Sequence, residues 1–362
     1  MSRIHRLERK LFMIYNLKSV KDAQVKNKPV LLRVDTDVPI ENSVIKDDSR
    51  LNAWQPTLQY LVENGAKVII VGHLGRPEGK DEKPTLLPIA TWLNSKLQTQ
   101  NSKLNTIKIG EFDGWELTDK VSILENIRFY PEEEKNDSAF AQKLASLAQV
   151  FVNDAFATAH RAHASTEGVT HFLPSFAGLR ILEEVKVLSE VLENPKRPLC
   201  VIIGGAKIET KLPLVKKMHQ FADFVLVGGT LCGDEETILN VANEETTHQS
   251  ILLLAETLED KKDITLKSVE NFIQVAKEAK TIVWNGPLGQ IEEEEYQKGT
   301  QVLAQALVEI DAFKVVGGGD TVGFLKEHNL LTNFSFVSTG GGAMLEFLSG
   351  EKLPGLVALE QK

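Results

Sequence analysis

Five apolar, β-branched runs in the second half of the chain each end in a short turn that carries glycine. They read VIIGGAK (201–207), VLVGG (225–229), IVWNGPLG (282–289), KVVGGGDT (314–321) and FVSTGGGA (336–343). A strand that stops at glycines and passes into a helix presents backbone N–H groups at the positive end of the helix, where a phosphate binds well. Five such turns predict an open parallel sheet whose carboxyl edge binds phosphates.

The strand-like runs of the first half end differently, with arginine, histidine and aspartate. They are RVDTDVP (33–39), DDSRL (47–51), GHLGRP (72–77), ENIRF (125–129) and NDAFATAHRAHAS (153–165). Because strand ends and the loops after them face one crevice in a doubly wound sheet, these segments are expected to converge. The predicted basic cluster contains Arg50, His73, Arg76, Arg128, His160, Arg161 and His163. Guanidinium groups match phosphate and carboxylate oxygens in pairs, so the predicted ligand is small and multiply anionic.

These residues also admit other interpretations. A single arginine taken alone is better explained by a surface ion pair, and only the repetition at successive strand ends favours a site. His160 and His163 have an H-x-x-H spacing, which is a weak indication of metal without supporting carboxylates or cysteines. The sequence has no G-x-x-x-x-G-K-[ST] motif, so its phosphates must be held differently from those of P-loop enzymes. The acidic runs Glu132–Glu134 and Glu292–Glu295 are expected to be mostly solvated.

The elements that position these residues alternate between strand-like and helix-like patterns, as in βαβ units. In the first half, strands are expected at 29–35, 66–73, 122–126 and 149–154, and helices at 51–65 and 138–148. Residues 180–194 have apolar side chains at helical spacing, and Pro195 and Pro198 end that helix, which is the expected domain boundary. Residues 230–265 are polar, and no path is predicted for them.

Composition restricts the class of protein. With 362 residues the chain is long enough for two domains, and its 42% apolar and 25% charged residues are ordinary for a soluble globular protein. The net charge of −9 argues against a nucleic-acid-binding surface, and no apolar run approaches the roughly 20 residues of a membrane span. Cys200 and Cys232 are expected to be buried, reduced thiols of a cytoplasmic protein. The basic N-terminus lacks a signal-peptide core, and residues 1–12 are expected to be an extension ahead of Met13.

Taken together, these segments resemble the phosphoglycerate kinase family. The motifs RVDTDVP, SRL, GHLGRP, LENIRF, VNDAFATAHRAHAS, GGAKIETK, WNGPLG, GGGDT and STGGGA occur in the family's order, from about residue 28 to the C-terminus. The resemblance implies an α/β fold of two Rossmann-like parallel-sheet domains, each with three αβα layers, joined by a hinge helix. It places a 3-phosphoglycerate-binding domain at 1–179, the interdomain helix at 180–196 and a nucleotide-binding domain at 197–352. Residues 353–362 would pack back on the first domain.

The resemblance also implies an activity, which is reversible phosphoryl transfer between 1,3-bisphosphoglycerate and ADP to give 3-phosphoglycerate and ATP, with hinge closure. The implied catalytic residues are Arg50, Lys207, Gly341 and Gly342, with a further N–H from Gly340. The implied substrate-binding residues are Asp35, Thr36, Asp37, Arg50, His73, Leu74, Gly75, Arg76, Arg128 and Arg161. The implied nucleotide-binding residues are Gly205, Lys207, Lys211, Gly229, Pro287, Glu292, Gly318, Gly319, Asp320 and Thr321.

Magnesium is the implied cofactor, with Asp320 as its protein ligand, although by itself that aspartate is equally well explained as a helix N-cap. The acceptor is a carboxylate that is already ionised near neutral pH, so the reaction needs no general base. What it needs is charge stabilisation at the transfer point, and Arg50 and Lys207 are the candidates for that role. Lys207 and Lys211 are four residues apart, so a helix would place both on one face.

The chain departs from the family in several places. Asp37 stands where the family usually has asparagine, and Thr36 where it usually has an aromatic or aliphatic residue. Glu209 adds negative charge within GGAKIETK. Between the positions of Gly229 and Asp263, family members have many more residues, and some of those residues enclose the adenine. The sequence therefore predicts weak or poorly selective recognition of the base, with GDP competing well against ADP.

Two other functions remain open from the sequence. A non-catalytic relative could bind phosphorylated ligands as a sensor or scaffold, but the retained Lys207, Lys211 and Asp320 favour the enzyme. A different carboxylate kinase is kept as an interpretation because of Asp37. The expected partners are small-molecule substrates, with no nucleic acid and no membrane, and the protein is expected to be a cytoplasmic monomer.

Overall fold

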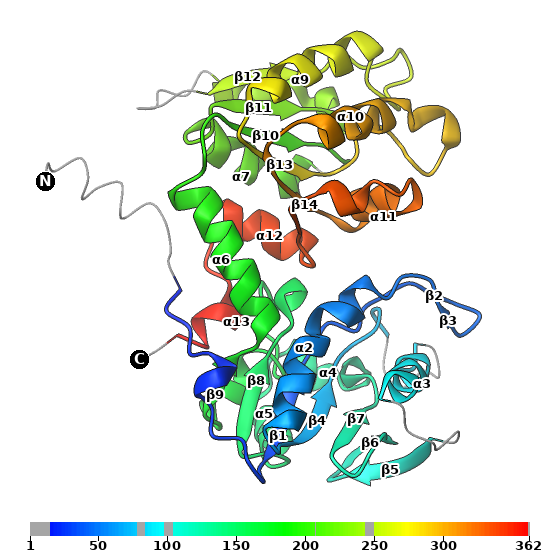
Figure 1. Cartoon of the computed structure of the whole chain (residues 1–362), viewed down its shortest axis with the longest axis vertical. Helices are drawn as coiled ribbons and strands as arrows, with labels where there is room; N and C mark the ends of the chain where they lie inside the picture. Colours follow the sequence, from blue (N-terminus) through cyan, green and yellow to red (C-terminus); the bar gives the residue numbers. More distant parts are fainter. Residues whose placement is uncertain (1–14, 78–83, 98–103, 207, 243–249, 361–362) are drawn as a thin grey trace, which may run out of the picture. The chain divides into compact units, whose positions relative to one another are not determined.

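The computed structural model describes residues 15–77, 84–97, 104–206, 208–242 and 250–360 (Figure 1). The predictions made for Lys207 and for residues 1–12 lie outside these ranges. The described chain forms two compact units. The N-terminal unit runs to Val185 and takes in the residues after Glu351, and the C-terminal unit runs from Lys186 to Glu351. Helix α6 (Leu179–Glu193) crosses from one unit into the other.

The N-terminal unit is built on a seven-stranded sheet of order β5-β6-β7-β4-β1-β8-β9. Its strands are β1 (Pro29–Arg33), β4 (Lys67–Val71), β5 (Asn105–Ile109), β6 (Phe112–Glu116), β7 (Val121–Leu124), β8 (Val150–Asn153) and β9 (Ser175–Ala177). Strands β7, β4, β1, β8 and β9 pair in parallel, whereas β5 and β6 add an antiparallel edge that the sequence did not predict. A small hairpin, β2 (Ile40–Glu41) and β3 (Val44–Ile45), stands apart from the sheet.

Helices cover the N-terminal sheet because alternate residues of its central strands face opposite sides. Val30 and Leu32 of β1 belong to a core that also contains Trp54 of α2 (Ser49–Glu63) and Leu93 of α3 (Leu87–Lys96). The remaining helices are α4 (Pro131–Glu134), α5 (Ser138–Ala145) and α13 (Pro354–Val357). Helix α13 returns to this unit, where the backbone N–H of Gly355 donates to the carbonyl of Ala159 at 2.8 Å.

The C-terminal unit has a six-stranded, wholly parallel sheet of order β12-β11-β10-β13-β14-β15. The strands are β10 (Leu199–Ile203), β11 (Phe224–Val227), β12 (Ile251–Leu254), β13 (Thr281–Asn285), β14 (Phe313–Gly317) and β15 (Phe336–Val337). Five of them precede the glycine turns of the sequence. The sixth, β12, lies within 230–265 and was missed.

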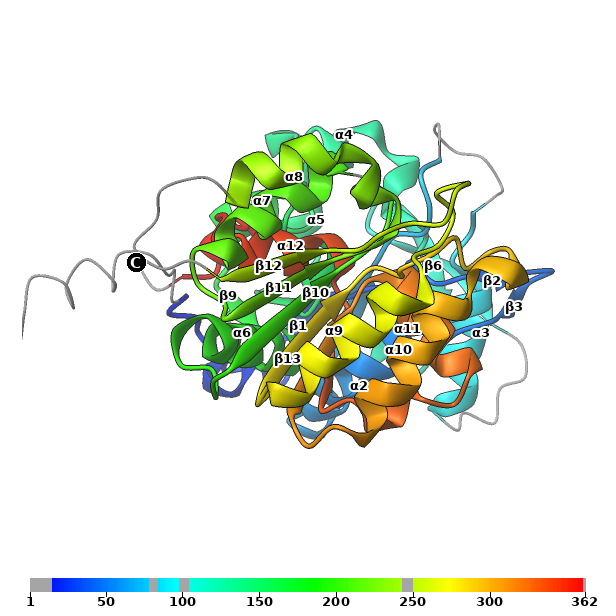
Figure 2. The ribbon, with the colours of Figure 1, turned by 90° about the horizontal axis from the view of Figure 1, so that it is seen from above.

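Two helical layers sandwich this sheet (Figure 2). One contains α7 (Ile208–His219), α8 (Glu235–Ala242) and α12 (Gly341–Leu348), and the other contains α9 (Leu266–Glu278), α10 (Lys298–Glu309) and α11 (Gly319–Glu327). Phe272 of α9 and Leu303 of α10 share a core with Trp284 of β13. The three-layer αβα architecture follows from strands that are apolar on both faces, since both faces then need a helical cover.

Candidate active site

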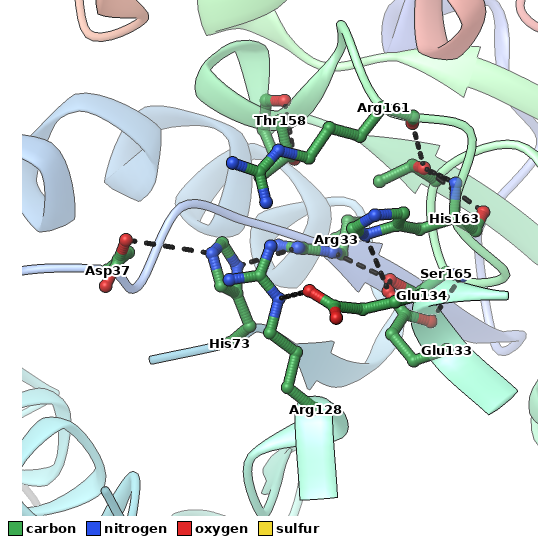
Figure 3. A network of polar contacts seen from close by, with 12 residues as sticks. Arg33, Asp37, His73, Arg128, Glu133, Glu134, Thr158, Arg161, His163 and Ser165 are labelled. Carbon is green, nitrogen blue, oxygen red and sulfur yellow. Dashed lines mark hydrogen bonds and ion pairs between the residues drawn. The ribbon is translucent and has the colours of Figure 1, made fainter. Parts of the chain in front are cut away.

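Cationic side chains gather at the carboxyl end of the N-terminal sheet (Figure 3). Arg33 ends β1, His73 follows β4, and Arg128 lies in a single helical turn after β7. Arg161 and His163 follow β8. These residues, together with Arg50 at the start of α2, are called the arginine cluster below. The carboxyl ends of parallel strands meet at one edge, and that is what brings together residues up to about 130 positions apart in sequence.

Arg33 is the centre of this cluster and was not among the predicted ligands. Its side chain is only 1% exposed. Its Nε donates to Ser165 Oγ at 2.9 Å, and its Nη2 donates to His73 Nδ1 at 3.0 Å. Burial lowers the pKa of Arg33, and the nearby Glu133 carboxylate partly offsets this. The signal in the sequence is the position of Arg33, which opens RVDTDVP and ends β1, but an arginine inside a predicted strand does not by itself indicate a buried cluster.

Glu133 is the exception in the acidic run 132–134, which was expected to be mostly solvated and in which Glu132 and Glu134 are exposed. Its side chain is fully buried. The backbone N–H of Ser165 donates to Glu133 Oε2 at 2.8 Å, and the Ser165 hydroxyl donates to Oε1 at 2.5 Å. Burial raises the pKa of Glu133, while Arg33 favours its ionised form. Glu133, Ser165 and Arg33 therefore form one buried polar chain that holds the guanidinium in place.

The histidines of the cluster contribute little positive charge. Burial, reinforced by the neighbouring arginines, lowers the pKa of His73 well below its ordinary value. Burial together with nearby arginines also lowers the pKa of His160 to about 4 and that of His163 to about 3. At neutral pH these rings are uncharged, so the positive charge of the cluster comes from its arginines.

The first loop residues of the site are held by main-chain contacts. The Asp35 carboxylate is buried, and its Oδ2 accepts from the backbone N–H of Ala157 at 3.0 Å. Burial raises the pKa of Asp35 to about 6, although Arg33 opposes the shift. Thr36 is fully buried, and its hydroxyl donates to the carbonyl of His73 at 2.7 Å, so that hydroxyl orients the loop. A Cβ at Gly72 would come within 2.2 Å of the Thr36 hydroxyl, which explains the glycine at this position.

The remaining predicted substrate residues lie around the same loop. The Asn126 side chain holds both main-chain polar groups of Leu74. Its amide nitrogen donates to the Leu74 carbonyl at 2.8 Å, and its amide oxygen accepts from the Leu74 N–H at 3.2 Å. Gly75 has φ +62°, and its carbonyl accepts from Arg128 Nη1 at 2.7 Å. Arg76 is exposed. Arg50 Nη1 donates to the Asp37 carbonyl at 2.7 Å.

In the C-terminal unit, the turns after β10, β11 and β13 pack backbone against backbone. Gly205, Gly229 and Gly286 have φ of +98°, +74° and +94°. A Cβ at Gly286 would lie 2.1 Å from the carbonyl oxygen of Gly204, and one at Gly229 would lie 2.8 Å from the N of Gly205. The Gly205 N–H donates to the Pro287 carbonyl at 2.8 Å. Glycine is therefore required here both for conformation and for space.

The next two turns bring a pair of helix N-termini together. Helix α11 begins after Gly318, at φ +96°, and α12 begins after Gly340. A Cβ at Gly341 would lie 3.2 Å from the Cα of Gly318, so the two helix starts are in contact. Thr321 accepts from the N–H of Gly286 at 3.0 Å, which ties α11 to the turn after β13. Two positive helix ends side by side favour an anion.

Lys211 of α7 points to the same edge of this sheet. Its ammonium group donates to the side-chain oxygen of Asn285, the last residue of β13. Burial lowers the pKa of Lys211 to about 8, and the Asp320 carboxylate partly offsets this shift. The Nδ2 of Asn285 is buried without a hydrogen-bond partner among the described residues, so it is a donor left for a ligand. Lys207 lies outside the described residues.

The segments predicted to border the base are tied to each other. Lys262 Nζ pairs with Glu293 at 2.9 Å and lies 4.7 Å from the centre of the Tyr296 ring. The N–H of Gln290 donates to the Lys262 carbonyl at 2.8 Å. Glu292, the predicted ribose ligand, is exposed. The run Glu292–Glu295 is exposed throughout, as expected.

Two absences apply to the described part of the chain. No group of three or more histidine, cysteine, aspartate or glutamate side chains there is arranged to hold a metal ion. Nor does any helix there combine the length and the apolar character that a membrane span requires.

Known proteins resemble this chain along nearly all of its length. The family model described as phosphoglycerate kinase matches residues 20–234 and 235–351. Curated phosphoglycerate kinases of Moorella thermoacetica and Dictyoglomus turgidum are 38% and 40% identical, each over 95% of this chain, and 99% and 98% of those proteins are covered. The Moorella comparison spans 391 residues, more than the 362 of this chain, so the relative has residues that this chain lacks.

Solved structures agree with the sequence comparisons. The phosphoglycerate kinase from Coxiella burnetii has a TM-score of 0.77 at 33% identity, and the one from Pyrococcus horikoshii OT3 has 0.79 at 29% identity. Each comparison covers 95% of this chain and 98% of the solved chain.

Proposed function

The chain belongs to the phosphoglycerate kinase family, and we propose that it transfers a phosphoryl group reversibly between 1,3-bisphosphoglycerate and ADP, giving 3-phosphoglycerate and ATP. The enzyme is then a glycolytic phosphotransferase with a carboxyl group as acceptor. Its ligands are small molecules, and the proposal includes a cytoplasmic, monomeric protein that binds neither nucleic acid nor membrane.

The arginine cluster is the observation that carries this proposal. Arg33 and Arg128 are buried, and burying a guanidinium is costly unless anionic groups compensate its charge. Burial lowers the pKa of Arg128 to about 10, with Arg161 adding to the shift and Glu134 opposing it. Glu133 and Glu134 offset part of this cost, and a ligand with a phosphate at one end and a carboxylate at the other would add further compensating charge. 3-Phosphoglycerate is such a ligand.

The C-terminal unit suits the phosphates of a nucleotide. The paired helix N-termini and Lys211 present N–H donors and a cation at one edge of its sheet, and the tight turns at Gly205, Gly229 and Gly318 lie at the same edge. These groups would hold the phosphates, with Lys207, Pro287 and Gly319 as further proposed contacts. Glu292 is the proposed ribose ligand.

Magnesium fits this edge as a nucleotide-bound ion. Mg²⁺ usually takes one or two carboxylates and completes its shell with phosphate oxygens and water. Asp320, in the first turn of α11, supplies one carboxylate near Lys211. When bound, the ion would neutralise charge on the phosphates, and Asp320 would hold it.

The chain's own residues then account for catalysis by charge stabilisation. The carboxylate acceptor needs no general base, and the buried histidines are neutral at working pH, so they are not required as cations. We assign Arg50 and Lys207 to the transferring phosphoryl group, and the N–H groups of Gly341 and Gly342 to its oxygens. Direct in-line transfer requires donor and acceptor to meet, so hinge closure is part of the proposal.

The test is release of ADP from Mg-ATP by the purified protein, with and without 3-phosphoglycerate. We expect release only with 3-phosphoglycerate, and a loss of about a hundredfold or more in Arg50→Ala. A melting curve like that of wild type would show that the variant is folded. Folded wild-type protein that binds 3-phosphoglycerate but releases no ADP would instead support the non-catalytic sensor or scaffold. Release that depends on another carboxylic acid would support a different carboxylate kinase.

A further inference from the structure

Asp37 reaches the arginine cluster from the loop after β1, and its two carboxylate oxygens have different surroundings (Figure 3). Oδ1 accepts from the backbone N–H of Gly75 at 3.0 Å. Oδ2 lies 3.8 Å from His73 Nε2. The side chain is 45% exposed, so this carboxylate is open to a ligand in solution.

The ring of His73 faces Asp37 as a neutral donor. Arg33 can only donate hydrogen bonds, so the His73 Nδ1 that it contacts at 3.0 Å must be the unprotonated nitrogen. A neutral ring then carries its proton on Nε2, the atom directed at Asp37. Burial and the surrounding arginines lower the pKa of His73, which keeps the ring in this neutral form. Asp37 therefore faces a dipole at this contact and not a positive charge.

Glu134 offers a contrast on the other side of the cluster. It is similarly exposed, at 52%, but it lies 3.1 Å from Arg128 Nε in a direct ion pair. The positive charge of Arg128 therefore largely neutralises the negative charge of Glu134. Within the described residues, the ion-pair contact of the Asp37 carboxylate is with the uncharged His73, and Arg33 and Arg128 act on it from farther away.

Asp37 also has a role that does not depend on its charge. Gly75, whose N–H donates to Asp37 Oδ1, also accepts at its carbonyl oxygen from Arg128 Nη1 at 2.7 Å. The backbone carbonyl of Asp37 accepts from Arg50 Nη1 at 2.7 Å. Through these bonds Asp37 sets the positions of two arginines, and an amide oxygen could accept from Gly75 as well as a carboxylate oxygen does.

We propose that the carboxylate of Asp37 is a built-in competitor of the anionic substrate, which weakens substrate binding at the arginine cluster while its hydrogen bond to Gly75 keeps the site assembled. The proposal rests on the function proposed above and names the residue that sets substrate affinity. A phosphate or carboxylate that enters the cluster meets a negative charge that has no direct cationic partner among the described residues. Asp37 thus lowers the affinity for the anionic ligand and makes its release easier.

Two substitutions separate the charge from the hydrogen bond. Asp37→Asn removes the charge and keeps an oxygen for Gly75, so 3-phosphoglycerate is expected to bind about tenfold tighter at low ionic strength. Asp37→Ala removes both, so its gain is expected to be smaller than that of Asp37→Asn. Asp113→Asn is the matched control, because Asp113 is a similarly exposed carboxylate, at 41%, of the same unit that pairs with Lys108.

The experiment is calorimetric titration of the full-length protein with 3-phosphoglycerate, at low salt and at about 0.5 M salt, where charge effects are screened. Tighter binding in Asp37→Asn that shrinks with salt, with Asp113→Asn like wild type, would support the proposal. Unchanged or weaker binding in Asp37→Asn, or an equal gain in Asp113→Asn, would overturn it. Melting curves like that of wild type would show that the substituted unit is folded, and ADP titrations should be the same for all variants. If wild type binds no 3-phosphoglycerate, the proposed function fails, and this inference fails with it.

Discussion

Binding of nucleotide is predicted to take up a proton on Lys211. The ammonium group of this lysine is buried against Asn285, and its pKa is lowered to about 8. Phosphates that arrive beside it favour the charged form and return its pKa toward the ordinary value of about 10.4. Any molecule in which Lys211 was neutral must then gain a proton as it binds ADP.

The size of the uptake follows from the pKa. With a value of about 8, roughly a tenth of the molecules hold Lys211 neutral at pH 7, about half at pH 8 and about nine tenths at pH 9. Proton uptake per bound ADP should rise in the same order. The nucleotide itself adds little in this range, because a phosphate with a second pKa of about 6 is already ionised.

The assay is titration calorimetry of ADP binding in two buffers of different ionisation enthalpy at each pH, since the difference in heat gives the number of protons taken up. Lys211→Arg is the matched control, because arginine keeps the positive charge and does not titrate in this range. It should bind ADP more weakly but without uptake. Equal uptake in wild type and Lys211→Arg, or no uptake by wild type between pH 7 and 9, would refute the reasoning.

Four further predictions concern other parts of the molecule. Lys207→Ala should lose on the order of a hundredfold or more in turnover, and wild-type kinetics would remove Lys207 from the transfer site. Burial raises the pKa of Asp154 to about 7, so its ionisation costs stability progressively as pH rises from about 4 to about 7. Asp154→Asn keeps an oxygen for the N–H groups at the start of α6. Its free energy of unfolding in urea should therefore match that of wild type near pH 4 and exceed it by a few kcal/mol at pH 8. A gain independent of pH would contradict this prediction. Lys314 donates to three carbonyls at the end of α10, at 2.9 to 3.1 Å. Lys314→Met should therefore lower the free energy of unfolding by about 2 to 3 kcal/mol. Unchanged stability would show that those carbonyls find other donors. Because the chain is shorter than its relatives, GDP should compete well with ADP in equilibrium binding, and a strong preference for ADP over GDP and IDP would exclude a trimmed base site.

Much of the fold was predictable because its determinants are local. Strands β1, β4, β10 and β13 are short apolar runs buried on both faces, and such runs read directly as parallel strands. The antiparallel strands β5 and β6 were missed because neither is a clear apolar run. Strand β5 (NTIKI) lies at the edge of the sheet and has no buried residue, and β6 (FDGWE) has aspartate and glycine between its buried aromatic residues. Strand β12 was missed because a short ILLL run inside a polar segment does not distinguish a strand from a loop. Helix α8 lies in the same segment and was missed with it.

The residues that end the strands could be identified in the sequence, together with the local reason for each. Gly205, Gly229, Gly286 and Gly318 all have positive φ, a demand of the local backbone that only glycine meets easily. Arginines after the strands of the first half were likewise visible in the chain, because the edge at which parallel strands end is set by their direction.

The charge states and the pairings of these residues depend on how distant segments pack. Arg33 meets Ser165, 132 residues away, and His73, 40 residues away, and no pattern in the chain predicts those distances. Burial then keeps His73 neutral, encloses Glu133 within a run that looked solvated, and leaves Asp37 beside an uncharged ring. A pKa depends on desolvation and on every charge nearby in space, and these are fixed only when distant segments pack together.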